Sequence, residues 1–128
     1  MIESTKYIIK ELKLFINKFK NVRVRYEYDE LALVHIIEVL PNEVYHLDKN
    51  YIEWELQMFD NFIKKFPCEN INFISDDALV GIKTPVFSKS GIEYKENFKD
   101  RYQKIVASKQ FKTTYENKNI GDSIFIDD

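Results

Sequence analysis

The sequence is poor in the residues that mark several classes of protein. Its 128 residues include one cysteine, three glycines and three prolines, and the formal net charge is only -2. So few glycines and prolines exclude collagen-like and low-complexity chains. A hydrophobic fraction of 45% with so small a net charge also excludes intrinsic disorder. We therefore expect a folded chain of ordinary globular composition.

The sequence also lacks the features of secreted and membrane proteins. No apolar run approaches the roughly 20 residues that a membrane span requires. The first residues, 1–6, show no basic stretch followed by an apolar one, so we expect no signal peptide. Cys68 has no second cysteine with which to form an internal disulfide, which suits a reducing compartment. These observations predict a cytoplasmic protein without membrane contact.

The first forty residues show a change of apolar period. Residues 4–19 have the three- and four-residue spacing of an amphipathic helix, whereas residues 22–28 alternate as a half-buried strand does. The run 31–40 is almost entirely apolar, which is typical of a strand covered on both faces. The short junction Asp29-Glu30 predicts that the two strands form an antiparallel hairpin. Residues 44–47 are compatible with a further short strand.

A second helix is predicted over residues 51–66. Asn50 lies three residues before Glu53, which resembles a capping box. Pro67 ends the pattern. The apolar stripe of this helix consists of Ile52, Leu56, Phe59, Ile63 and Phe66.

For the remainder of the chain, the sequence predicts some elements and leaves alternatives for others. Residues 71–74 form a short strand, and residues 78–87 are either a helical turn or irregular chain. Ser90 and Glu93 have the spacing of a capping box, which predicts a third helix over residues 91–108. Beyond it, the alternating residues form either a terminal hairpin or, over residues 117–128, a loosely attached tail.

Taken together, these elements predict an α+β fold. We expect a single compact domain over residues 1–128, with an antiparallel or mixed sheet packed by about three helices. Such layouts serve interaction proteins, nucleic-acid binders and nucleases alike, so the fold class does not decide the function.

Charge is segregated along the chain. Residues 1–25 sum to +5, residues 26–77 to -9, residues 83–118 to +5, and the last ten residues to -3, which together give -2. The middle segment is therefore strongly acidic. Such a run either solvates a surface or forms one face that attracts a basic partner.

One set of residues is compatible with metal-dependent nuclease chemistry. Asp76 and Asp77 precede the E-x-K triplet of Glu93 and Lys95, and a pair of carboxylates with a nearby lysine can hold a divalent metal and position water. The predicted helix argues against this reading, because residues two apart do not share a helical face. In the alternative interpretation, the two aspartates only end a strand.

The other reactive residue types are too scattered to predict a site. His35 and His46 are the only histidines, and neither has the ligand spacing of a zinc site. His35 lies in the most apolar strand, so we expect a buried, hydrogen-bonded imidazole. Cys68 lies next to Glu69, and a thiol beside a carboxylate is a poor nucleophile. The sequence predicts no metal and no cofactor.

Aromatic residues accompany the acidic segment, and they supply the candidate partner-binding residues. A partly exposed tryptophan with tyrosines and acids nearby is typical of an interface anchor. The leading hypothesis is a small, non-enzymatic protein that binds a basic partner, as an inhibitor or an immunity protein does. A nuclease is the alternative, and nucleic-acid binding through residues 83–118 is less favoured at a pI of about 5.8. The predicted partner-binding residues are Tyr26, Tyr28, Tyr45, Tyr51, Trp54 and Glu55.

Overall fold

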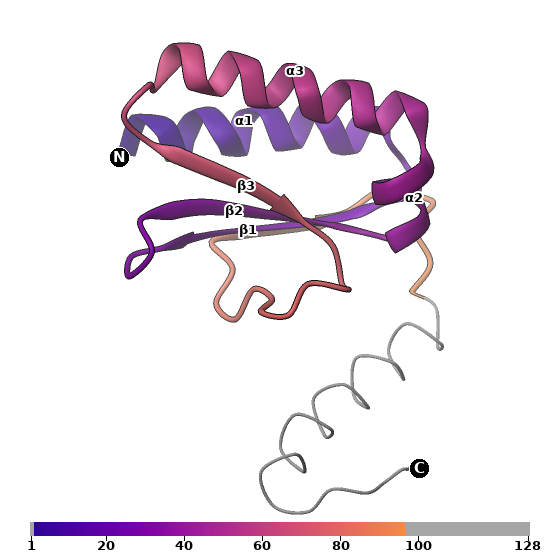
Figure 1. The fold of residues 1–128 in the computed structure, drawn as a ribbon. Coiled ribbons are helices and arrows are strands. Elements are labelled where there is room, and N and C mark those ends of the chain that lie inside the picture. The colour runs from indigo at the N-terminus through magenta and orange to yellow at the C-terminus, as the bar shows by residue number, and fades with distance from the viewer. Residues whose placement is uncertain (1, 97–128) are drawn as a thin grey trace, which may run out of the picture. The chain divides into compact units, whose positions relative to one another are not determined.

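In the computed structural model, residues 2–96 are described, and they contain seven helices and strands (Figure 1). The chain separates into two compact units, Met1–Tyr94 and Lys95–Asp128, and the first contains all seven of these elements. Its elements in chain order are α1 (Ile2–Lys18), β1 (Arg23–Asp29), β2 (Val34–Leu40), α2 (Asn42–Leu47), α3 (Lys49–Lys65), β3 (Asn70–Ile74) and β4 (Phe87–Ser90).

The four strands form one mixed sheet in the order β3-β2-β1-β4. Strand β1 pairs antiparallel with both β2 and β4. Strands β2 and β3 are parallel, and α2 and α3 form the crossover connection that such a pair requires. Helices α1 and α3 cover one face of the sheet (Figure 1). The predicted α+β fold with a mixed sheet and three helices is confirmed.

The core lies between this sheet face and the two long helices. Alternation along β1 and β2 directs Val24, Tyr26, Ile37 and Val39 toward the helices, and all four are fully buried. Ring contacts join the helices to one another, such as Phe15 of α1 with Trp54 of α3 at 4.1 Å between centroids. The predicted first helix and the predicted antiparallel hairpin are confirmed. The second strand, however, begins at Val34 and not at residue 31, because residues 31–33 belong to the hairpin turn, where the N–H groups of Leu31 and Ala32 donate to Asp29.

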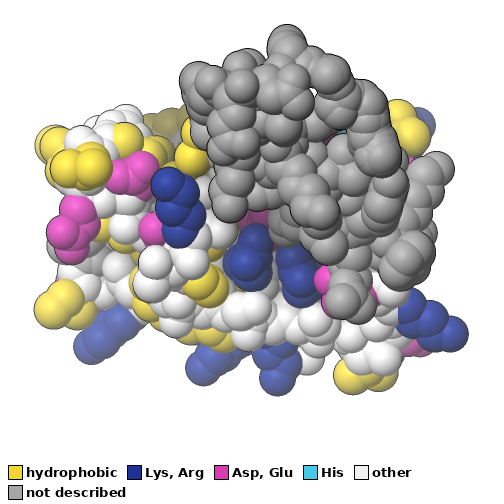
Figure 2. Space-filling model, turned by 90° about the horizontal axis from the view of Figure 1, so that it is seen from below, with side chains coloured by type: hydrophobic (Ala, Val, Ile, Leu, Met, Phe, Trp, Pro, Cys, Tyr) yellow, Lys and Arg dark blue, Asp and Glu magenta, His cyan; other side chains and the backbone are white. Residues whose placement is uncertain are grey.

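The opposite face of the sheet is partly covered by the segment 75–86. The backbone N–H of Lys83 donates to Glu27 Oε1 at 3.0 Å, and Ile82 of this segment is 7% exposed. Glu38 lies on this face, fully buried, and its Oε1 accepts a hydrogen bond from Arg25 Nε at 2.8 Å. Figure 2, which views the molecule from this side, shows apolar, basic and acidic side chains interspersed where they are visible.

Two predictions around the second helix are wrong. Residues 44–47 belong to the helix α2 and not to a strand, because Val44 and Tyr45 donate their backbone N–H groups to the carbonyl of Pro41. Helix α3 is capped by Asp48, whose side chain accepts from the N–H of Tyr51 at 3.0 Å. Asn50 therefore lies inside the helix and is not its cap.

The predicted helix over residues 91–108 does not begin at Gly91. Ser90 is the last residue of β4, and residues 91–96 form a turn and irregular chain. The N–H of Gly91 donates to Val22 O and that of Glu93 to Lys20 O, so tertiary partners replace helical ones. A Cβ at residue 91 would overlap the backbone of Lys20, which explains the glycine. Residues 97–108 and the predicted terminal hairpin or tail lie outside the described residues.

Candidate functional site

The predicted partner-binding residues do not form one exposed surface. Tyr26 and Tyr51 are 0% exposed, so burial in the core removes their side chains from any surface. The other four residues are half-buried. Trp54 packs between Phe15 and Phe73, which makes it mainly a core residue.

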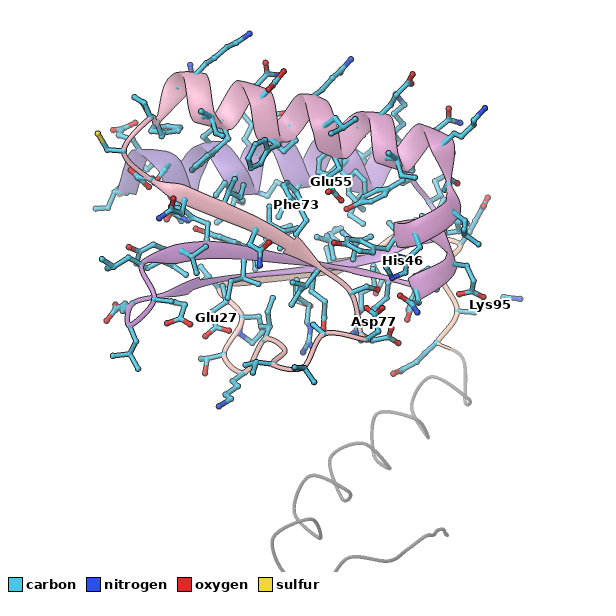
Figure 3. All side chains as sticks on the ribbon, in the orientation of Figure 1. Glu27, His46, Glu55, Phe73, Asp77 and Lys95 are labelled. Carbon is cyan, nitrogen blue, oxygen red and sulfur yellow. The ribbon has the colours of Figure 1, made fainter. Side chains whose placement is uncertain are left out.

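Tyr51 shows how the core holds a polar aromatic residue. Its hydroxyl donates to Glu55 Oε1 at 2.7 Å. Burial, together with this acceptor, raises the pKa of Tyr51 far above its usual value. Glu55, labelled in Figure 3, therefore serves as the hydrogen-bond acceptor for Tyr51 of its own helix.

The acidic residues of the segment 26–77 are distributed over several local roles. Asp29 accepts N–H bonds in the hairpin turn, Asp48 caps α3, and Glu38 is buried beside Arg25. The segment therefore does not place its acids on one face. Any attraction for a basic partner must come from a smaller group of acids.

The residues of the nuclease hypothesis lie on loops. Asp77 Oδ2 is 2.8 Å from His46 Nε2 in an exposed pair (Figure 3). Glu93 is in the turn after β4, and Lys95 follows in irregular chain. Among residues 2–96, no three His, Cys, Asp or Glu side chains are grouped so as to hold a metal ion. No geometry in this part of the chain favours the nuclease hypothesis, which stays a hypothesis.

The predicted nucleic-acid segment, residues 83–118, falls only partly within the described residues. Lys83, Lys89 and Lys95 are exposed there. Residues 97–118 lie outside the description, so this prediction also stays a prediction.

A buried polar network surrounds His35. The imidazole is 0% exposed, with Nδ1 2.7 Å from the Tyr26 hydroxyl and Nε2 2.7 Å from Glu69 Oε1. The Ser4 hydroxyl donates to the same carboxylate oxygen at 2.7 Å. The prediction of a buried, hydrogen-bonded histidine is confirmed.

This network contains the residue types of a nucleophilic triad but not its arrangement. In a triad, the acid and the nucleophile contact opposite nitrogens of the imidazole. Here Ser4 Oγ at 3.4 Å and Glu69 Oε1 at 2.7 Å both approach Nε2. Ser4 is also 0% exposed. The geometry supports a structural role, in which the network ties α1 to β1, β2 and the start of β3.

Helix α3 carries a row of exposed apolar residues that its sequence pattern had assigned to the packed side. Ile52, Leu56, Phe59 and Ile63 are 38%, 62%, 41% and 40% exposed. The residues that α3 buries instead are Tyr51, Met58 and Phe62. We call the exposed row the α3 stripe.

The α3 stripe faces away from α1. At 3.6 residues per turn, it is centred about 110° around the helix from the buried face. Trp54 and Lys65 lie on the other side of that face, where they contact Phe15 and Tyr7 of α1. The stripe is therefore a lateral surface of the described unit, and a partner can approach it without displacing α1.

Comparison of the chain with models of protein families, with curated proteins and with solved structures finds no match. Within the described residues, no helix is both long and apolar enough to cross a membrane.

Proposed function

We propose that this chain is a non-enzymatic interaction module that binds a basic protein partner through the α3 stripe, as an inhibitor or an immunity protein does. The exposure of the α3 stripe is the observation that carries the proposal. Exposed apolar residues that lie singly are ordinary, but a contiguous row is typical of an interaction surface.

The acids beside the α3 stripe support a basic partner. Glu53 and Asp60 are exposed on one side of the stripe, and the half-buried Glu55 lies on the other. Charges at the rim of an interface steer association and discriminate between partners. The proposed setting is the cytoplasm, which suits the one cysteine, the free and exposed Cys68.

Affinity capture with substitutions in the α3 stripe tests this proposal. Full-length protein is immobilised and exposed to a lysate of the native host, in parallel with Leu56→Ser. The matched control is Leu14→Ser, because Leu14 of α1 is exposed to a similar degree, 58%. We expect a basic protein that is retained by the wild type and by Leu14→Ser but lost from Leu56→Ser.

A charge reversal provides the second arm. Glu53→Lys with Asp60→Lys is expected to abolish capture of the same protein, whereas Glu43→Lys on the exposed surface of α2 is expected to leave it unchanged. Circular dichroism checks that each variant is folded. Capture that is indifferent to both the apolar and the charge substitutions would refute the proposal.

A further inference from the structure

The spacing of the α3 stripe is that of a helix-pairing seam. Its residues, 52, 56, 59 and 63, are separated by four, three and four positions. A helix that alternates three- and four-residue steps presents one straight row to a second helix. The seam spans about 17 Å at 1.5 Å per residue, or roughly three turns.

The positions that flank such a seam are also defined by the spacing. In paired helices they are the residues that select the partner by charge, and here they are residues 53, 55, 60 and 62. Phe62 is buried in the core of this chain. The remaining three, Glu53, Glu55 and Asp60, are all acidic.

This charge pattern argues against a second copy of the same helix as the occupant. Pairing of two α3 helices, in either direction, would bring acidic flanks together, and like charges at these positions disfavour association. Lysine or arginine on the partner would instead meet Glu53 and Asp60. The seam is therefore complementary to a basic helix.

Resting on the proposed function, we infer that the ligand of the α3 stripe is a single amphipathic helix of the partner protein. Its apolar residues recur at alternating three- and four-residue intervals, and its flanking positions are lysine or arginine. The partner's helix lies along α3, with its apolar row against Leu56 and Phe59 and its basic residues beside Glu53 and Asp60.

Designed peptides test this inference directly on the full-length protein. The first probe is a labelled helical peptide of about 21 residues, three heptads, with leucine in the seam and lysine at the flanks. The second has glutamate at the flanks. The third has the composition of the first, but its leucines are placed at every second residue. Binding is measured by fluorescence anisotropy at moderate ionic strength, because low salt exaggerates charge effects.

We expect the first peptide to bind at least about tenfold more tightly than either of the others. Leu56→Ser and Phe59→Ser should each weaken its binding about tenfold, since each removes a partly exposed apolar side chain from the contact. Leu14→Ser should leave it unchanged. Glu53→Gln with Asp60→Gln should reduce the preference for lysine over glutamate flanks, whereas Glu43→Gln should not.

The outcomes separate this inference from the proposed function. Equal binding of the first and third peptides, or binding that Leu56→Ser leaves intact, overturns the helical ligand. If the captured host protein depends on Leu56 while the first peptide fails to bind, the surface is retained and only the helical ligand is overturned. If no host protein is captured through Leu56 and the first peptide also fails to bind, the proposed function is overturned as well.

Discussion

At the scale of single residues, Leu33 is the one non-glycine residue with a positive φ in the described part of the chain. Its φ of 58° is left-handed, where glycine is favoured and a side chain is strained. Leu33 closes the β1–β2 hairpin loop, whose preceding N–H groups, of Leu31 and Ala32, donate to Asp29. The Leu33 side chain is 61% exposed, so its removal costs little packing.

Leu33→Gly should therefore stabilise the protein. Relief of the left-handed strain outweighs the added freedom of the unfolded chain, and we expect the free energy of unfolding to rise by about 0.5 kcal/mol. Urea denaturation measures it. Leu31→Gly is the control, since Leu31 is exposed in the same loop without a positive φ, and it should give no gain. Equal effects of the two substitutions would contradict the strain.

The burial of His35 could be predicted from the sequence, but its hydrogen-bond partners could not. A histidine within an apolar strand predicts burial, and burial requires hydrogen-bond partners. The identity of those partners is not predictable, because Ser4 and Glu69 lie 31 and 34 residues away in the chain. Only the packing of α1 on the sheet brings them to the imidazole.

At the scale of elements, the periodicity of the sequence predicts that α3 is a helix but not which of its faces packs against the core. The existence of the helix and its end near Pro67 follow from the sequence. Its apolar residues, however, cover a wide arc, and the longest regular row is not the one that packs. Tyr51 belongs to the buried face because its ring packs against Phe15 and Phe19 of the core, and its hydroxyl is satisfied there by Glu55. Apolar periodicity alone does not predict this burial of a polar aromatic residue.

The two faces of α3 should differ sharply in their effect on stability. Phe62→Ala removes a fully buried ring and should lower the free energy of unfolding by about 3–5 kcal/mol. Phe59→Ala, at a side chain that is 41% exposed, should cost about 1 kcal/mol or less. Thermal and urea unfolding of the two variants measure the difference. Comparable losses would mean that the α3 stripe is covered in the intact chain.

The remaining errors at this scale have two physical causes. Asp48 ends α2 and caps α3, so a junction with no intervening loop replaced the predicted strand and the predicted cap. Likewise, Ser90 and Glu93 have the local spacing of a helix start, but pairing of β4 with β1 carries the chain past Lys20 instead. In the first case other local hydrogen bonds, to Pro41 and Asp48, decided the structure, whereas in the second case tertiary hydrogen bonds outweighed the local signal.

At the scale of the whole described unit, the sequence predicts the fold class but not the surface. Periodicity predicts α1, α3 and the strands β1, β2 and β3, whereas α2 and β4 were not predicted. The α3 stripe could be recognised as an exposed surface only once the burial of its side chains was known. Three of the acids in residues 26–77 likewise proved to serve a turn, a helix cap and a buried ion pair, namely Asp29, Asp48 and Glu38. The candidate site is thus a smaller feature than the charge pattern suggested.

The network around His35 joins elements that are distant in the chain, and it gives the whole unit a dependence on pH. Burial alone would raise the pKa of Glu69, but hydrogen bonds from His35 and Ser4 outweigh it and hold the pKa of this carboxyl below its usual value. The folded state therefore binds a proton at Glu69 less readily than the unfolded state does.

Acidification should consequently weaken the fold through Glu69. As the pH falls below about 4.5, the unfolded carboxyl takes up a proton first, so the free energy of unfolding decreases until the folded pKa is passed. Glu69→Gln lacks this proton uptake and should lose stability less steeply. Urea midpoints at intervals from about pH 6 to pH 3 measure both slopes. Glu43→Gln, which removes an exposed carboxyl of α2, should follow the wild type. Parallel curves for Glu69→Gln and the wild type would show that Glu69 does not link the fold to pH.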